Sequence, residues 1–275
     1  MSMVYDSMAK ELLDGFGEIQ LKNPLIQCIT NRVTINDCAN ALLAIGASPV
    51  MADGNDAGEM AELVDALVIN IGSVKDSDKS AIRDAAKVAG KRGIPIILDP
   101  VGAGSTPTRI QFVKKLLKDY PIGIVRGNWS EIQAIGEGKS TTRGVDSSKD
   151  ASPSPELLKK WAKELGVVLA VTGKEDWITD GERLVAIGNG DIRLQQITGT
   201  GCMSTALCGA TAVACGDLFW GAALGVLLLS LSGEKKGKSL ATNEGSGTLR
   251  VRLMDQLNLM NLGKLTQEGR ARYEL

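Results

Sequence analysis

Short apolar runs rich in β-branched residues alternate with amphipathic stretches along most of this 275-residue chain, and this alternation limits the possible folds more than any other feature. The apolar runs are typical of strands in a parallel sheet that is covered on both faces. They lie at residues 48–52, 66–71, 94–98, 122–126 and 167–172. Helical spacing is found at residues 34–45, 57–63, 78–92, 109–118 and 155–165, with Gly46 and Gly93 at two of the expected C-terminal caps. We therefore predict an α/β fold, a three-layer α/β/α sandwich with a mostly parallel central sheet, formed by residues 1–275 as a single domain.

The last third of the chain departs from this alternation. Three consecutive helices are expected at residues 201–215, 218–232 and 248–262, and a strand at residues 192–195 precedes them. Between that strand and the first helix lies the sequence Thr198-Gly199-Thr200-Gly201-Cys202. Glycines let the backbone bend until several N–H groups point at one spot, and the first turn of a helix adds partial positive charge. The segment is thus a candidate anion site, although glycine also serves ordinary tight turns.

The composition excludes several classes of function. The chain has no histidine, which rules out Ser-His-Asp and Cys-His hydrolases, histidine bases and histidine metal sites. A pI of about 5.7 without a basic stripe, and an aromatic content of 4%, argue against nucleic acid as a partner. The five cysteines are odd in number and form no C-x-x-C pair, which suggests free thiols in a reducing cytosol.

We expect neither a signal peptide nor a membrane span. The first residues include acidic side chains and no apolar h-region. Residues 218–233 are uncharged and rich in leucine, but the stretch is shorter than the roughly 20 residues that cross a bilayer. A buried core helix explains this stretch better, and we expect a cytoplasmic protein without membrane contact.

Polar residues follow three successive predicted strands. Asp99 follows the third strand, Arg126 ends the fourth and is followed by Asn128 and Glu131, and Thr172 ends the fifth. In an open parallel sheet ligands collect beyond the carboxyl ends of the strands, so these side chains are expected on one rim. Carboxylates and an amide suit a hydrated Mg²⁺, and an arginine suits phosphate. Each residue also has a purely structural interpretation: Asp99 caps a turn, Asn128 is the N-cap of the helix bearing Glu131, and Arg126 pairs with a surface acid.

Several motifs occur together and in order between residues 23 and 257. They are T-N-R-V-T-I-N-D-C-A-N from Thr30, D-P-V-G-A-G from Asp99, R-G-N-x-x-E from Arg126, G-V-D-S from Gly144, V-T-G-x-x-D from Val171 and T-G-T-G-C from Thr198. With this set the chain resembles the hydroxyethylthiazole kinases. The resemblance implies a ribokinase-like fold and phosphorylation of 4-methyl-5-(2-hydroxyethyl)thiazole by Mg-ATP, in thiamine biosynthesis or salvage.

The resemblance also implies roles for individual residues and a homotrimer whose thiazole sites lie between neighbouring subunits. Thiazole contacts are implied for Met51, Asn31, Val33 and Gly199, and ATP contacts for Arg126, Thr172 and Asn128. The implied metal-side acids are Asp99 and Glu131, and the implied catalytic set is Gly199, Thr200, Gly201 and Cys202, whose backbone forms an anion hole for the γ-phosphoryl group.

Cys202 stands where related sugar kinases carry an aspartate base, and the cysteine is characteristic of the thiazole kinases. A thiol at a helix N-terminus has its thiolate favoured, so we expect Cys202 either to accept the proton of the alcohol or only to shape the pocket. Three positions depart from the usual family pattern: Gln27, Asp191 and residues 245–249.

Three other functions are compatible with parts of this pattern. A kinase of another small alcohol, such as a pyrimidine or pyridoxal, shares the fold and the phosphate site. A dehydratase of the ribokinase-like group uses the same sheet for elimination instead of transfer, but the motif of such enzymes is closer to the aspartate-bearing form than to this cysteine form. A non-catalytic nucleotide-binding protein would bind ATP without forming a phosphorylated product.

Overall fold

The computed structural model describes residues 2–138, 154–237 and 240–274. Within these residues the chain forms a nine-stranded sheet in the order β2-β1-β3-β4-β5-β6-β7-β8-β9. The neighbours from β2 to β6 pair in parallel, and the pairs from β6 to β9 are antiparallel. The strands are β1 (Leu25–Ile29), β2 (Ser48–Val50), β3 (Ala66–Asn70), β4 (Ile96–Asp99), β5 (Ile124–Asn128), β6 (Val168–Thr172), β7 (Asp176–Thr179), β8 (Leu184–Ile187) and β9 (Ala271–Tyr273).

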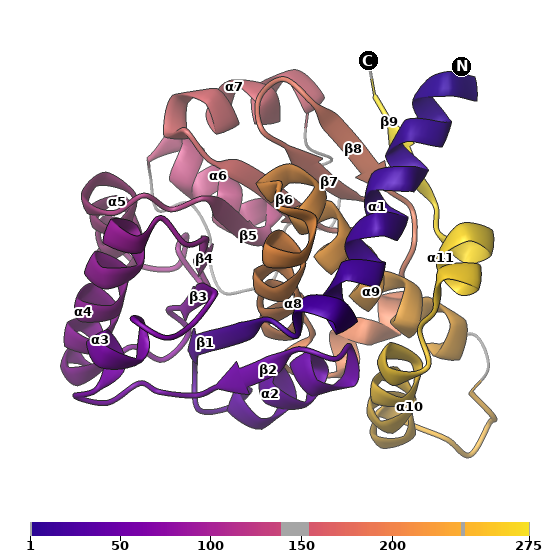
Figure 1. The fold of residues 1–275 in the computed structure, drawn as a ribbon, viewed down its shortest axis with the longest axis horizontal. Helices are drawn as coiled ribbons and strands as arrows, with labels where there is room; N and C mark the ends of the chain where they lie inside the picture. Colours follow the sequence, from indigo (N-terminus) through magenta and orange to yellow (C-terminus); the bar gives the residue numbers. More distant parts are fainter. Residues whose placement is uncertain (1, 139–153, 238–239, 275) are drawn as a thin grey trace.

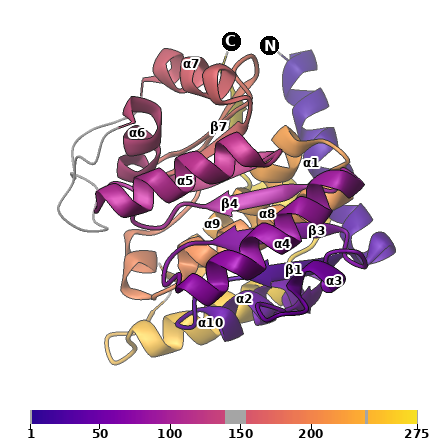
Figure 2. The same cartoon turned by 90° about the vertical axis from the view of Figure 1, so that its left-hand side faces the viewer.

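Helices cover both faces of the sheet, because each face carries its own cluster of buried apolar side chains. One face is covered by α3 (Ala57–Met60), α4 (Asp76–Arg92), α5 (Pro107–Asp119), α6 (Trp129–Glu137) and α7 (Pro155–Leu165). The other is covered by α1 (Ser2–Lys22), α2 (Ile35–Ala44), α8 (Thr200–Cys215), α9 (Leu218–Gly237), α10 (Ser246–Asn258) and α11 (Leu262–Glu268). Figure 1 shows the strands running between these helices, and Figure 2 looks onto α4 and α5 with β4 behind them. The predicted three-layer α/β/α sandwich with a mostly parallel sheet is confirmed.

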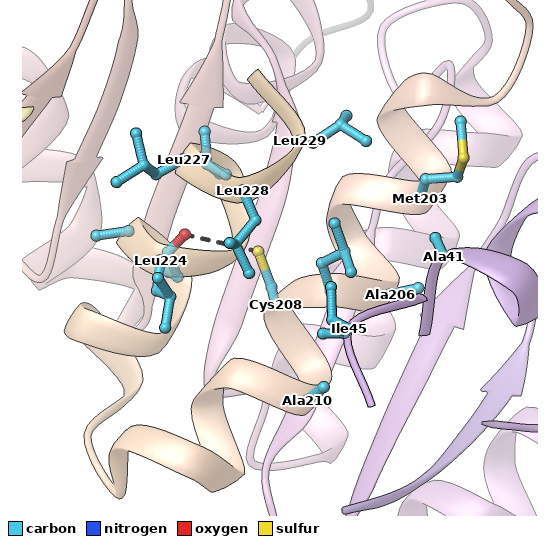
Figure 3. Packing of buried hydrophobic residues seen from close by; sticks show 14 of the residues in the cluster. Ala41, Ile45, Met203, Ala206, Cys208, Ala210, Leu224, Leu227, Leu228 and Leu229 are labelled. Carbon is cyan, nitrogen blue, oxygen red and sulfur yellow. Dashed lines mark hydrogen bonds between the residues drawn. The ribbon is translucent and has the colours of Figure 1, made fainter. Parts of the chain in front are cut away.

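The helix α8 is closely packed in the middle of one layer. Figure 3 shows it between α9 and α2, with Met203, Ala206 and Cys208 directed at their side chains. A Cβ at Gly225 of α9 would lie 2.6 Å from the backbone nitrogen of Cys208, so the two backbones approach as closely as only glycine allows. This packing fixes the N-terminus of α8 at one place relative to the sheet.

The structure corrects one predicted strand. Residues 192–195 are not extended: they lie in a short 3₁₀ helix, Ile192–Gln196. The carboxylate of Asp191 accepts a hydrogen bond from the Arg193 backbone N–H at 2.9 Å and pairs with the Arg193 guanidinium, which stabilises the local turn. The predicted helix at residues 248–262 corresponds to α10, which ends at Asn258. Asn261 then caps a separate helix that was not predicted, α11, by accepting the N–H of Lys264.

The remaining differences concern short or terminal elements. The sequence analysis missed α1, β1 and the strands β7, β8 and β9. The five other predicted strands and the helices before residue 240 are confirmed, with ends that shift by a few residues. The motif that begins at Gly144 lies outside the described residues. None of the helices within the described part of the chain is both long enough and apolar enough to cross a membrane.

Candidate active site

Polar side chains from several strands gather at the carboxyl edge of the sheet, next to the start of α8. The strand register places Asn70 of β3 opposite Asp99 of β4, and Asn128 of β5 opposite Thr172 of β6. All four residues are the last of their strands. The predicted rim of strand-end residues is therefore real, and it contains Asn70 in addition.

The turn that opens α8 faces Arg126. Gly199 has a φ of 87°, a conformation that strains any side chain, and a Cβ there would lie 2.5 Å from Cγ2 of Thr34. A Cβ at Gly201 would lie 2.5 Å from Nη1 of Arg126. The N-cap residue, Gly199, has no side chain that could cap this end of α8. The Arg126 guanidinium thus lies against the first turn of α8, and a cation beside a helix N-terminus is an arrangement that suits a phosphate.

Asn70 connects the residues around the start of α8. Its amide nitrogen donates to Oδ2 of Asp99 at 2.9 Å and to Sγ of Cys202 at 3.2 Å. Its amide oxygen accepts from Nδ2 of Asn31 at 3.2 Å, and Asn31 also donates to Sγ of Cys202 at 3.3 Å. Thr205, one turn into α8, donates its hydroxyl to Oδ2 of Asp99 at 2.8 Å. The predicted residues Asn31, Asp99 and Cys202 are therefore in one hydrogen-bonded network.

Sequence reasoning missed two members of this network. Asn70 ends a strand that was predicted, so listing the polar residue at the end of every strand would have found it. Thr205 follows Gly201 by four residues and therefore lies on the same face of α8. The same spacing would have marked it as a candidate once the helix start was recognised.

Asp99 and Glu131 are both buried, and their negative charges act on each other. Glu131 accepts the backbone N–H of Gly102 at 2.8 Å and that of Asn128 at 2.9 Å. Burial and then the charge of Asp99 raise the pKa of Glu131 to about 7. Burial also raises the pKa of Asp99, against the opposing effect of the Arg126 charge. A cation beside these two carboxylates would relieve both the burial cost and the repulsion.

The donor set fits Mg²⁺. Mg²⁺ is typically held by one or two carboxylates, and water and phosphate oxygens complete its shell. Among the described residues there is no group of three or more histidine, cysteine, aspartate or glutamate side chains that would form a dedicated metal cage. Two acids next to a phosphate site, rather than a closed cage, are what a metal that arrives with a nucleotide needs.

The Cys202 thiol does not have the predicted thiolate character. Burial, followed by the negative charge of Asp99, raises the pKa of Cys202, although hydrogen bonds from Thr34, Asn31 and Asn70 oppose the shift. The positive end of α8 is outweighed because the thiol is enclosed and lies near a carboxylate. Cys202 is thus a neutral thiol in the free protein.

The contacts of Arg126 and Asn128 test the structural interpretation that the sequence offered for each residue. Arg126 is 9% exposed, donates to the Thr172 hydroxyl at 2.5 Å, and its buried Nε has no hydrogen-bond partner in the described structure. This position at the base of the rim, and not on the surface, rules out the surface-acid interpretation. Asn128 accepts the N–H of Glu131 at 3.0 Å in a reciprocal capping box, so the N-cap interpretation is confirmed. Thr172, the last residue of β6, lies beside the end of β5, and its hydroxyl is 3.4 Å from the Gly127 carbonyl oxygen.

A buried acid fixes the turn after Thr172. Asp176 accepts the N–H of Gly173 at 3.0 Å and the hydroxyl of Ser230, on α9, at 2.8 Å. Burial raises the pKa of Asp176 to about 6. The turn that borders Arg126 is therefore tied to the helical layer behind the sheet.

The residues expected around a thiazole do not form a buried network like the one around Asp99. Asn31 is buried, and its Oδ1 accepts the backbone N–H of Val33 at 3.1 Å. The Val33 residue itself is 68% exposed. Met51 directly follows β2 at the edge of the sheet and is half-buried against the core. This side of the site is open to solvent.

Comparison with known proteins identifies the group to which these features belong. The model of the hydroxyethylthiazole kinase family matches residues 16–262. A hydroxyethylthiazole kinase of Alkaliphilus oremlandii is 39% identical over 265 residues, covering 96% of this chain and 98% of that protein. The solved structure of a hydroxyethylthiazole kinase protein from Pyrococcus horikoshii is 33% identical, with a TM-score of 0.85 and coverage of 97% and 100%. A ribokinase-like superfamily protein from Enterococcus faecalis, 14% identical with a TM-score of 0.56 and coverage of 85% and 87%, shares the fold.

Proposed function

Since this chain belongs to the hydroxyethylthiazole kinase family, we propose that it transfers the γ-phosphoryl group of ATP to the hydroxyl of 4-methyl-5-(2-hydroxyethyl)thiazole. The reaction belongs to thiamine biosynthesis or salvage. The observation that carries the mechanism is the approach of the α8 start to Arg126, which a Cβ at Gly201 would meet at 2.5 Å. This turn, the guanidinium and the Asp99 network lie together at the carboxyl edge of the sheet.

In this mechanism the γ-phosphoryl group lies over the first turn of α8. The backbone N–H groups of Thr200, Gly201 and Cys202 stabilise the charge on its oxygens, and Arg126 with Thr172 holds the phosphate tail. Asn128 keeps its capping role and contributes to the ATP site by fixing the start of α6. Phosphoryl transfer depends mainly on such positioning and charge stabilisation.

Asp99 and Glu131 would hold Mg²⁺ together with phosphate oxygens. Bound there, the metal would neutralise negative charge that builds up between the phosphates during transfer. The chain contributes two further features to this step. Asn70 and Thr205 orient the Asp99 carboxylate, and the N–H groups of Gly102 and Asn128 orient that of Glu131.

Cys202 acts in this proposal by shape and hydrogen bonding, because its thiol is neutral. It lies between Asn31 and Asn70 and therefore next to the proposed hydroxyl position. Asn31, Met51, Val33 and Gly199 form the thiazole side. As the new O–P bond forms and the bond to ADP breaks, the alcohol passes its proton late to an oxygen of the transferred phosphoryl group, so no strong base is needed.

We further propose that the chain forms a homotrimer in which a neighbouring subunit covers the open thiazole side. Val33, Leu43 on α2 and Val251 on α10 are 68%, 57% and 62% exposed, which supports an apolar contact surface. A hollow of about 370 Å³ between α2 and α10 lies on the same surface. Sedimentation of Leu43→Glu and Val251→Glu tests this: smaller species with a raised KM for thiazole are expected, and an unchanged trimer would contradict it.

The chain is proposed to work as a single domain in the cytoplasm, where its five free cysteines remain reduced. The decisive experiment mixes the purified protein with Mg-ATP and hydroxyethylthiazole, with hydroxymethylpyrimidine as the control acceptor. Phosphorylated thiazole and little phosphorylated pyrimidine are expected. ATP binding without any phosphorylated product would refute the proposed activity, and a preference for the pyrimidine would change its substrate.

A further inference from the structure

One guanidinium joins the two turns that carry the acids and amides of the active site. We propose that Arg109 is a positioning residue for phosphoryl transfer, holding the turn after β3 and the turn after β4 in one fixed arrangement. The proposal relies on the proposed function only for its effect on rate. Its structural part concerns the free protein and can be tested without any substrate.

The contacts of Arg109 reach across both turns. Nη1 donates to the carbonyl oxygen of Ile71 at 2.9 Å and to that of Val101 at 2.8 Å. Nη2 donates to the carbonyl oxygen of Gly72 at 2.9 Å. Ile71 and Gly72 follow β3, and Val101 follows β4. Three backbone acceptors from two loops therefore share one charged donor group.

Each of these turns holds a residue of the site in place. The N–H of Gly72 donates to Oδ1 of Asn70 at 2.9 Å, and Asn70 binds Asp99 and Cys202 through its amide nitrogen. The N–H of Gly102 donates to Oε1 of Glu131 at 2.8 Å. If the two turns separate, the orientation of Asn70 and that of the Glu131 carboxylate change together.

The helix that bears Arg109 gives no reason for a cation at this position. Arg109 is the third residue of α5, and its own backbone N–H donates to the Thr106 hydroxyl that caps the helix. The N-terminal turn of a helix carries partial positive charge, so a guanidinium there is unfavourable for the helix itself. The three carbonyl contacts explain the residue type, because a planar fork can serve several acceptors in a fixed geometry and a lysine cannot.

Arg92 provides a matched control on the opposite edge of the sheet. This arginine, the last residue of α4, donates Nη1 to the carbonyl oxygens of Ala61 at 2.8 Å and Val64 at 2.5 Å. It therefore also joins a helix to a loop through backbone carbonyls. Its loop leads into the start of β3, whereas the active-site residue Asn70 lies at the end of that strand.

The experiment compares Arg109→Ala, Arg109→Lys and Arg92→Ala with the unmodified protein. Amide hydrogen exchange is measured without metal or nucleotide on segments that contain Gly72 and Gly102. The thermal midpoint, kcat, and KM for ATP and thiazole are measured on the same preparations. In Arg109→Ala we expect these two amides to exchange at least about tenfold faster, since their protection depends on local closure. We expect kcat to fall about 10- to 100-fold, as is usual when a residue that orients metal-side ligands is lost.

Arg109→Lys keeps the charge and is expected to give intermediate changes, and it is the variant that decides if Arg109→Ala does not fold. Arg92→Ala is expected to leave kcat and the exchange of Gly72 and Gly102 unchanged. The proposal is overturned if the folded Arg109 variants exchange these amides at the normal rate, or if kcat stays within about twofold while exchange rises. It is also overturned if Arg92→Ala produces the same changes. If the unmodified protein does not phosphorylate thiazole, the proposed function is refuted. The exchange rates alone then decide whether Arg109 holds the two turns together.

Discussion

Replacing Gly201 with alanine tests whether the start of α8 and Arg126 form one phosphate site. A Cβ at this position would lie 2.5 Å from Nη1 and 3.3 Å from Cζ of Arg126. Carbon and nitrogen atoms that are not bonded do not approach so closely, so the guanidinium has to move. Arg126 is only 9% exposed and donates to Thr172, so the guanidinium has little room to move. The substitution therefore shifts a charge without removing it.

The two effects on stability oppose each other. Alanine in place of glycine stabilises a helix by about 0.5–1 kcal/mol. Losing a hydrogen bond to a charged group costs about 1.5–3 kcal/mol. The free energy of unfolding of Gly201→Ala should thus fall by about 0.5–2.5 kcal/mol. A charged hydrogen bond of the same strength between Arg126 and the phosphate, if it is lost in the transition state, corresponds to a roughly 10- to 150-fold lower kcat/KM.

Steady-state kinetics with Mg-ATP and hydroxyethylthiazole, combined with thermal denaturation, measures both effects. Gly17→Ala is the control, because Gly17 is an exposed glycine of α1 whose added Cβ would meet no atom within 4 Å. It should raise the thermal midpoint and leave the kinetics unchanged. If Gly201→Ala is as active as the unmodified enzyme, then Arg126 does not hold the phosphate where the α8 turn meets it, and the mechanism proposed above is wrong.

Three further predictions concern other parts of the site. Cys202→Ser should lower kcat by less than about tenfold, because the native thiol is already neutral; inactivity of both Cys202→Ser and Cys202→Asp with thiazole binding intact would contradict this. Asn70→Ala should lower kcat/KM by about 10- to 100-fold, since it frees Asp99 and Cys202 from their shared donor; a fall of less than twofold would exclude an orienting role. Because burial raises the pKa of Asp176 from 3.8 to about 6, its unfolded form releases the proton first and stability falls as pH rises from about 4 to 6. Chemical denaturation over this range should show a loss of up to about 3 kcal/mol that Asp176→Asn lacks, and equal slopes for the two proteins would refute the assignment.

The parts of the fold that could be predicted are those with strong local patterns. Strands such as Ala66–Asn70 are buried on both faces and therefore read as continuous apolar runs. The strands β7, β8 and β9 were missed because they lie in the antiparallel part of the sheet, outside the strand–helix alternation by which the parallel strands were recognised. Residues 192–195 were misassigned because the hydrogen bond from Arg193 to Asp191 favours a local turn, which side-chain periodicity does not reveal.

The candidate site likewise has features that the sequence predicts and features that only the fold creates. Asp99, Arg126 and Glu131 were found because strand ends and charged residue types are visible in a sequence. The neutral state of Cys202 was not predictable, since it depends on burial and on the distance to Asp99, which is more than 100 residues away in the chain. Arg109 was read only as part of a helix, because its three carbonyl partners become neighbours only when two loops fold over it.

The neutral thiol also fits the electrostatics of the proposed reaction better than a thiolate would. During transfer, negative charge is carried by the oxygens of the moving phosphoryl group, and the site meets it with the N–H groups of the α8 turn and with Arg126. A thiolate at Cys202 would place a further negative charge at the first turn of that helix, where it would compete for the same N–H groups and repel the phosphate. Burial, followed by the charge of Asp99, raises the pKa of Cys202 and prevents this in the free protein. The burial that denies Cys202 the role of a strong base therefore preserves the anion site beside it.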